Sequence, residues 1–114
     1  MKEDVTMVPP SIVDKETSGD MVVREGSNVT LVCKALGYPE PYVMWRREDG
    51  DAISYNGETA LMRRHFFLSV NVIDGEVVTI TKVSRLHMGA YLCIASNGVP
   101  PSISKRVLLR VQCE

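Results

Sequence analysis

Apolar and polar residues alternate along many short segments of this chain. The clearest case is residues 28–35, where every second residue, from Val29 to Ala35, is apolar and small or branched. Because successive side chains of a β-strand point to opposite faces, these residues are expected to face a core. The same reasoning points a larger set inward: Val29, Leu31, Cys33, Ala35, Val43, Trp45, Val78, Ile80, Val107, Leu109 and Val111.

Turn residues separate these segments. We expect strands at residues 11–13, 21–24, 28–35, 42–47, 52–55, 66–72, 76–83, 90–96 and 102–112. Residues 37–41, 56–58 and 73–75 are expected to be loops or turns, and Asn97-Gly98 predicts a two-residue hairpin with positive φ at both positions. Residues 61–64 fit neither a helix nor a strand period. Many short strands without a convincing helix predict an all-β sandwich.

Length and charge exclude several function classes. The chain has 114 residues, the size of one domain, and a formal net charge of −1. It therefore carries no basic footprint for nucleic acid and no polybasic segment for an anionic membrane. Ser84, His87 and Asp74 lack the motif context of a nucleophilic site, and His65, His87 and Cys113 lack metal-ligand spacing. We expect no enzyme activity, cofactor or metal.

Four residues identify the kind of sandwich. Cys33, Trp45, Tyr91 and Cys93 have the order and spacing of the conserved positions in immunoglobulin domains, which the chain resembles. The resemblance implies an immunoglobulin-like, I-set β-sandwich of two antiparallel sheets. It also implies a Cys33–Cys93 disulfide, Trp45 packed against it, and a Tyr91 hydroxyl bonded to backbone near residues 85–88. Closing a loop of about 60 residues would stabilise the fold by roughly 4 kcal/mol.

The chain departs from the family pattern at His87. Many immunoglobulin domains have Asp-x-Gly-x-Tyr-x-Cys here, and His87 replaces the aspartate that often pairs with an arginine. Either His87 senses pH near its ordinary pKa of about 6.5, or it is an exposed corner residue with no role. The charged runs 46–49 and 63–65 are expected to be solvated faces or turns, or else contacts to a partner or an acidic glycan.

Longer stretches narrow the resemblance. Residues 20–31 and 88–102 closely resemble the second immunoglobulin domain of insect Dpr-interacting proteins, and residues 37–41 and 45–48 match the same group. Lachesin and the vertebrate IgLON proteins are similar but more distant. The resemblance implies a neuronal surface protein with three immunoglobulin domains and a C-terminal membrane anchor, whose first domain binds a Dpr-type partner.

The ends of the chain suggest a fragment. No stretch approaches the roughly 20 apolar residues that cross a bilayer, and the N-terminus lacks a signal-peptide pattern. A disulfide, however, is typical of an oxidising compartment. We therefore expect an extracellular piece of a cell-surface protein, with signal and anchor elsewhere. Residues 1–10 would be the linker and tail of a preceding domain, 11–112 the domain, and 113–114 its C-terminal boundary. Cys113 would be a free thiol, an intermolecular disulfide or a boundary artefact.

Two sites follow from strand alternation. Asn28-Val29-Thr30 is a glycosylation sequon on an outward strand position, although both polar residues are also ordinary for an exposed strand. On the sheet that holds Trp45 and Cys93, five side chains are expected to project outward as a protein-binding face: Tyr42, Met44, Leu92, Ile94 and Leu108. Loops or a neighbouring domain would otherwise cover them, and isolated exposed apolar residues are also normal.

Three functions remain open. The first is a recognition and adhesion module that positions a neighbouring domain, which binds other immunoglobulin-superfamily surface proteins of Dpr type. The second is an independent protein-binding domain of a secreted decoy or receptor, using its own outward face (the GFC face of such domains). The third is a hydrolase built on a sandwich, for which the sequence offers no catalytic constellation.

Overall fold

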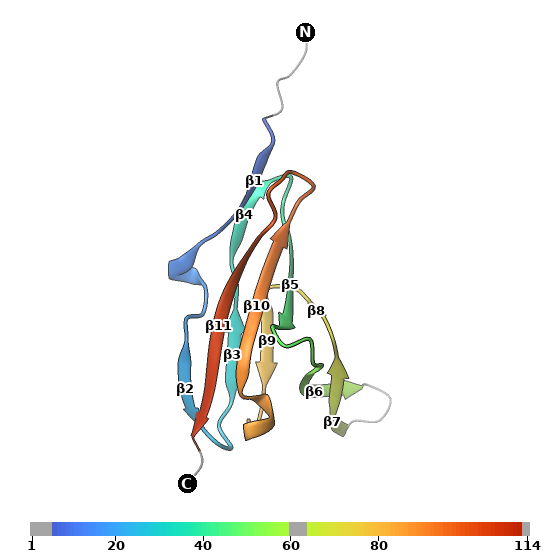
Figure 1. Cartoon of the computed structure of the whole chain (residues 1–114). Helices are drawn as coiled ribbons and strands as arrows, with labels where there is room; N and C mark the ends of the chain where they lie inside the picture. Colours follow the sequence, from blue (N-terminus) through green and yellow to red (C-terminus); the bar gives the residue numbers. More distant parts are fainter. Residues whose placement is uncertain (1–5, 60–63, 113–114) are drawn as a thin grey trace.

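The computed structural model describes residues 6–59 and 64–112, with side chains described outside residues 54–70. Two short 3-10 turns, η1 (Asp14–Glu16) and η2 (Arg85–His87), interrupt an otherwise all-β chain (Figure 1). The strands are β1 (Val8–Ile12), β2 (Met21–Arg24), β3 (Val29–Val32), β4 (Ala35–Tyr38), β5 (Tyr42–Arg47), β6 (Ile53–Thr59), β7 (Arg64–Val70), β8 (Ile73–Asp74), β9 (Val77–Ile80), β10 (Gly89–Ser96) and β11 (Ile103–Gln112).

The strands form an immunoglobulin-like sandwich, as predicted. One layer is a five-stranded sheet in the order β2-β11-β10-β5-β8, and the β3–β9 and β1–β4 pairs lie across the core from it. One pair departs from the antiparallel expectation, because β2 runs parallel to β11. After β1 the chain crosses through η1 to the edge of the five-stranded sheet without reversing direction. There the Asp20 carboxylate accepts a hydrogen bond from the Leu108 amide at 2.8 Å, which anchors the pairing.

The core confirms the alternation. Every residue that was expected to point inward is buried: Val29, Leu31, Cys33, Ala35, Val43, Trp45, Val78, Ile80, Val107, Leu109 and Val111. The pattern persists across the break between β3 and β4, where the Cys33 amide donates to the Glu76 carbonyl at 2.9 Å. Burying the apolar face of both layers is the main favourable contribution to folding. Ile53, at the start of β6, joins this core as well.

Several strand boundaries differ from the prediction. β1 begins at Val8 rather than at residue 11, and it buries Pro10. Gly37 lies inside β4, which pairs with β1, and Gly57 lies inside β6, which pairs with β7. Residues 73–74 are a short strand against β5 rather than a turn. In each case a partner strand supplies backbone hydrogen bonds, and this pairing outweighs the local preference of glycine or aspartate for turns.

The prediction of a two-residue hairpin at Asn97-Gly98 is wrong. Ala95 on β10 pairs with Ile103 on β11, so the connection spans residues 97–102, and only Gly98 has positive φ. The side chain of Asn97 is engaged elsewhere, in hydrogen bonds to the Val8 and Pro39 carbonyls. These bonds, together with the two prolines that follow, favour a longer loop over a tight turn.

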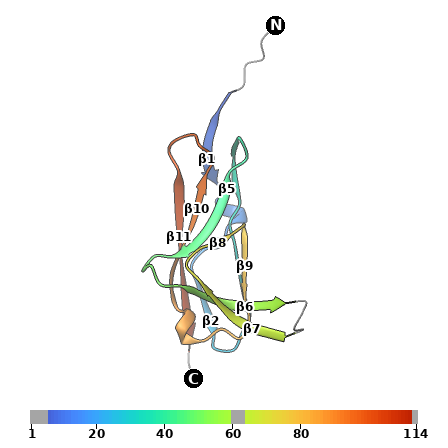
Figure 2. The same ribbon diagram turned by 90° about the vertical axis from the view of Figure 1, so that its right-hand side faces the viewer.

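The two ends of the sandwich carry the two ends of the chain. Figure 1 shows β1 starting at one end, beside the loops that follow β4 and β10, and β11 finishing at the other, near η2. Figure 2 shows β6 and β7 extending sideways from the lower part of the sandwich. Among the described residues, no helix has the length and apolar character needed to cross a bilayer.

Candidate functional site

The disulfide between Cys33 and Cys93 and the side chain of Trp45 form the centre of the fold. Cys33 and Cys93 are joined by a disulfide with a Cα–Cα distance of 6.4 Å. Trp45 on β5 pairs directly with Cys93 on β10, and its indole Nε1 donates to the Glu76 carbonyl at 3.3 Å. Because Trp45 is fully buried with its one polar group satisfied, it holds the two layers together rather than meeting a ligand.

The corner before β10 is built around Tyr91 and His87. The Tyr91 hydroxyl donates to the His87 carbonyl at 2.6 Å, within the stretch of residues that the sequence indicated. The expectation that His87 is an exposed residue is wrong, since only 3% of its surface is exposed. Its Nδ1 accepts a hydrogen bond from the Ser84 amide at 2.9 Å and so completes a capping box for η2. The histidine is therefore a folded part of the corner.

Arg47 corrects the expectation that residues 46–49 are all solvated. Only 8% of the surface of Arg47 is exposed. Its guanidinium donates hydrogen bonds to the Leu86 carbonyl at 3.2 Å and to the Met88 carbonyl at 2.9 Å. It also pairs with Asp49 at 3.2 Å. The hydrogen bond from Arg47 is the largest cause that holds the pKa of the Asp49 carboxyl below its usual value. Buried arginines need such partners, and the corner supplies them.

The outer face of the five-stranded sheet is the candidate protein-binding face. Strand register places its expected members side by side: Ile94 pairs with Met44, and Tyr42 pairs with Ser96 two residues further along the strands. Tyr42 is 48% exposed, and Met44 and Ile94 are half-buried. The Tyr42 hydroxyl donates to the Asp74 carboxylate, and this hydrogen bond is the largest cause that raises the pKa of Tyr42.

Arginines border this face. Leu92 is flanked across both neighbouring strands, by Arg46 on β5 and by Arg106 on β11. Arg106 is paired with Glu48 at 2.9 Å, and both side chains are exposed. The face thus combines half-buried apolar side chains with exposed cations. Such a mixed surface suits a protein partner better than a small molecule, because protein interfaces combine an apolar centre with a polar rim.

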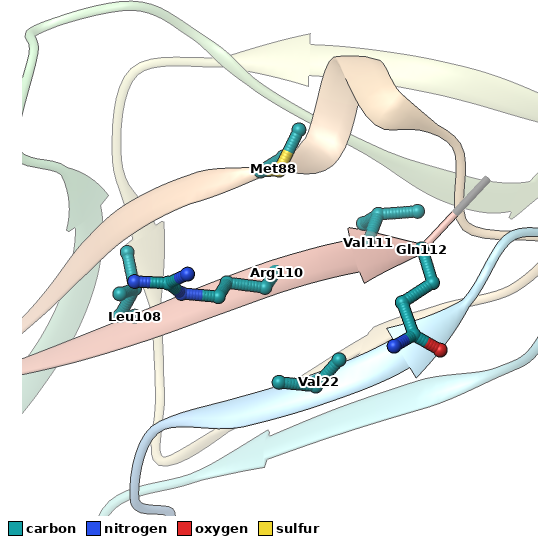
Figure 3. A pocket seen from close by; sticks show the side chains of 6 residues that line it. All are labelled: Val22, Met88, Leu108, Arg110, Val111 and Gln112. Carbon is teal, nitrogen blue, oxygen red and sulfur yellow. The ribbon is translucent and has the colours of Figure 1, made fainter.

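Leu108 lies in a hollow at the lower end of the same face. It pairs with Ala90, diagonal to Leu92, and so continues the apolar row toward β2. The hollow has a volume of about 540 Å³, and six residues line it (Figure 3): Val22, Met88, Leu108, Arg110, Val111 and Gln112. Val22 and Met88, which are exposed, were not among the residues predicted for this face. Period-two alternation in residues 21–24 was the available signal for Val22.

The other sequence candidates are distributed elsewhere. Asn28 is exposed just before β3, with its Oδ1 accepting from the Lys82 amide at 3.2 Å, and Thr30 is exposed as well. Asp74 bonds to Tyr42 at the outer face, whereas Ser84 contacts His87 at the corner, so this trio does not form one site. The described residues contain no group of three or more potential metal ligands. Cys113 and the side chain of His65 lie outside the described part.

Comparisons with known proteins agree with this architecture. The family model described as "Immunoglobulin domain" matches residues 9–97. Lachesin from Schistocerca americana is 28% identical over 96% of this chain and 28% of that protein. Limbic system-associated membrane protein from Gallus gallus is 35% identical over 94% of this chain and 26% of that protein. The chain therefore spans about a quarter of the length of these curated relatives.

Solved structures give higher identity. A structure of DIP-gamma IG1+IG2 is 47% identical with a TM-score of 0.82, covering 92% of this chain and 49% of that one. A structure of Dpr2 Ig1-Ig2 in complex with DIP-Theta Ig1-Ig3 is 52% identical with a TM-score of 0.78, covering 92% and 32%. The resemblance to immunoglobulin domains of this neuronal group, inferred from residues 20–31 and 88–102, is confirmed. The chain belongs to the immunoglobulin domain family and is similar to the domains of lachesin, IgLON, DIP and Dpr proteins.

Proposed function

We propose that this chain is a cell-surface recognition module that holds a neighbouring, partner-binding immunoglobulin domain in position. The observation that carries the proposal is the placement of β1 and β11. The chain enters the sandwich at one end and leaves it at the other (Figure 1). Domains joined before β1 and after β11 would therefore lie in series, with this domain between them. Such a spacer needs neither a cofactor nor catalysis.

The solved relatives support the proposed partner. The chain covers 49% of a DIP-gamma chain described as IG1+IG2, and 32% of a chain in a complex of Dpr2 with DIP-Theta Ig1-Ig3. These fractions correspond to one domain of two and one domain of three. We infer that the partner is an immunoglobulin-superfamily surface protein of Dpr type, bound mainly through the adjacent domain. In this proposal residues 1–10 join the preceding domain and residues 113–114 form the C-terminal boundary.

The chemistry of the fold supports a location outside the cell. A buried disulfide between Cys33 and Cys93 persists in oxidising compartments and is rare in the cytosol. One similar protein is named a membrane protein. We therefore infer that the domain stands at the outer surface of the plasma membrane, with its anchor in another part of the full-length protein.

A binding measurement tests the spacer role. Surface plasmon resonance would compare this chain alone with the full-length ectodomain, each against Dpr-type proteins. We expect binding by the ectodomain and none by the chain alone, because the partner surface belongs to the adjacent domain. Circular dichroism and thermal unfolding would establish that the isolated chain is folded. Binding of equal affinity by the folded, isolated chain would overturn the spacer role.

The second candidate function is direct binding through the outer sheet face. The pairing of Met44 with Ile94, next to Leu92 and its flanking arginines on the same face, favours it. Ile94→Asp would then abolish binding by the isolated chain. Val77→Asp is the matched control, because Val77 is an exposed apolar residue on β9, in the other layer. If Ile94→Asp leaves partner binding as strong as Val77→Asp does, this face is not the binding site.

A further inference from the structure

Asn97 ties together three segments at the end of the sandwich where β1 begins. Its Nδ2 donates to the Val8 carbonyl and to the Pro39 carbonyl, each at 2.8 Å. Its Oδ1 accepts from the Val99 amide at 3.0 Å. Both amide protons and one carbonyl lone pair are thus used. The first residue of β1, the loop after β4 and the loop after β10 are held by one side chain.

Gly37 makes room for this connection. A Cβ at position 37 would lie 3.0 Å from Asn97 Nδ2 and 3.1 Å from the Val8 carbonyl oxygen, closer than side chains usually pack. It would also meet Pro41 at 3.1 Å. The absence of a side chain at Gly37 lets β1 and Asn97 approach β4 closely. Because Asn97 holds the Val8 carbonyl and Pro9 and Pro10 restrict φ, the course of the chain through the start of β1 is fixed as well.

Large apolar side chains are exposed beside this connection. Met7, Val8, Leu36 and Tyr38 are each between 45% and 55% exposed. Val8 pairs with Tyr38, and Leu36 lies two residues earlier on the same outward side of β4. Several exposed apolar residues on two paired strands form a patch rather than scattered single residues, and such patches mark contact surfaces. We call Met7, Val8, Leu36 and Tyr38 the upper patch.

We propose that the upper patch is the seat of the immunoglobulin domain that precedes this one, and that Asn97 locks the junction into a rigid elbow. The occupant is the preceding domain because the chain that leads to it starts from the patch itself, at Val8. A tethered domain has a high effective concentration at the patch, so a small apolar contact is enough to keep it docked. This inference rests on the proposed function, since it assigns the junction through which the spacer would orient its neighbour.

Electron paramagnetic resonance distances in the full-length ectodomain test the elbow. One spin label on each of the two domains would report the spread of distances between them. We expect one narrow distribution for the wild type, and its loss in Asn97→Ala and in Leu36→Glu. Leu86→Glu is the matched control, because Leu86 is exposed at the opposite end of the domain, on η2. It should keep the narrow distribution.

Two test variants are used so that misfolding of one of them cannot be mistaken for loss of the elbow. Leu36 is exposed, so Leu36→Glu changes the patch without disturbing the core, and thermal unfolding would verify both variants. A broad wild-type distribution, or a narrow one that persists in both variants, overturns the elbow. The same proteins would be tested for Dpr-type binding. If the distance distribution is narrow and depends on Asn97 but the partner binds this domain, the elbow stands and the spacer role is overturned. If the distribution is broad and the partner binds only the adjacent domain, the spacer role stands and the elbow is overturned.

Discussion

The guanidinium of Arg47 lies over the ring of Tyr91, with Cζ 5.4 Å from the ring centroid. At this distance the cation is attracted to the electron-rich face of the ring. The same guanidinium bonds the carbonyls of Leu86 and Met88, so one side chain joins β5 to η2 and to the start of β10. Beside the ring, the partners of Arg47 are therefore these backbone carbonyls and the Asp49 carboxylate.

Replacing Arg47 should destabilise the domain strongly. In Arg47→Met the carbonyls of Leu86 and Met88 lose their donor in a part-buried site, and we expect a loss of about 2–4 kcal/mol in the free energy of unfolding. Arg46→Met is the matched control: Arg46 is the exposed neighbour on β5, and its loss should cost less than about 0.5 kcal/mol. Urea denaturation measures both. Equal losses would show that the carbonyl contacts are unimportant.

Gly89 should be coupled to Arg47. Its φ is +147°, and a Cβ there would lie 2.6 Å from Arg47 Nη2. Gly89→Ala should therefore cost about 1–3 kcal/mol, through backbone strain and displacement of the guanidinium. In the Arg47→Met background the displacement no longer matters, so the cost should fall. A double-mutant cycle by urea denaturation measures the coupling. Gly19→Ala, where nothing lies within 4 Å, should be close to neutral; additive costs in the cycle would contradict the contact.

The stability of the domain should fall at high pH because of Tyr91. Burial is the largest cause that raises the pKa of Tyr91, and the charge of Arg47 opposes it in part. The folded state therefore keeps the phenol proton at a pH where the unfolded state has lost it. The contribution of Tyr91 to stability is complete below the pKa of the phenol in the unfolded state, about 10. This contribution is lost as pH rises through the pKa of the phenol in the folded state.

Tyr91→Phe removes this titration. We expect the variant to be less stable near neutral pH, because the bond to the His87 carbonyl is lost, and to lose less stability than the wild type above pH of about 10. Urea denaturation as a function of pH gives both slopes, and Tyr38→Phe controls for loss of an exposed phenol. Parallel slopes for Tyr91→Phe and wild type would assign the effect to other groups.

Asn28 should carry a glycan when the protein is secreted from a eukaryotic cell. The sequon precedes and enters β3, with Thr30 exposed, and the Asn28 Oδ1 bond to the Lys82 amide leaves Nδ2 as the atom for attachment. Mass spectrometry before and after enzymatic deglycosylation should show the loss of one N-linked glycan. Thr30→Ala should have the unglycosylated mass from the start. An unmodified wild type in secreted material would exclude the site.

The core was predictable because burial in a strand is a local, period-two property. The alternation in residues 28–35 placed Val29 to Ala35 correctly even though the structure divides them between two strands. Strand pairing was not predictable in the same way. Gly57 and Ile73 read locally as turn residues, and only their partners on β7 and β5 make them part of strands.

In the candidate site, too, what depends on local alternation was predictable and what depends on distant partners was not. The five outward residues from Tyr42 to Leu108 follow from alternation, and their register agrees with a single face. Arg47 and Asn97 could not be placed, because their functional groups bond to residues far along the chain. Arg47 reaches carbonyls 39 and 41 residues away, and Asn97 reaches a carbonyl 89 residues away. A charged run and an Asn-Gly pair carry no local sign of such partners.

The parallel pairing of β2 with β11 has a mechanical consequence. A pull on the two ends of the chain draws β11 along its own axis past β2, and draws β1 along β4. The rungs from Met21–Leu109 to Arg24–Gln112 are then loaded together rather than opened one at a time. As a hypothesis for single-molecule force spectroscopy, a substitution of Asp20 by Ala, which removes the bond to the Leu108 amide, should lower the rupture force; an unchanged force would contradict it. A domain held in this way resists tension along the chain.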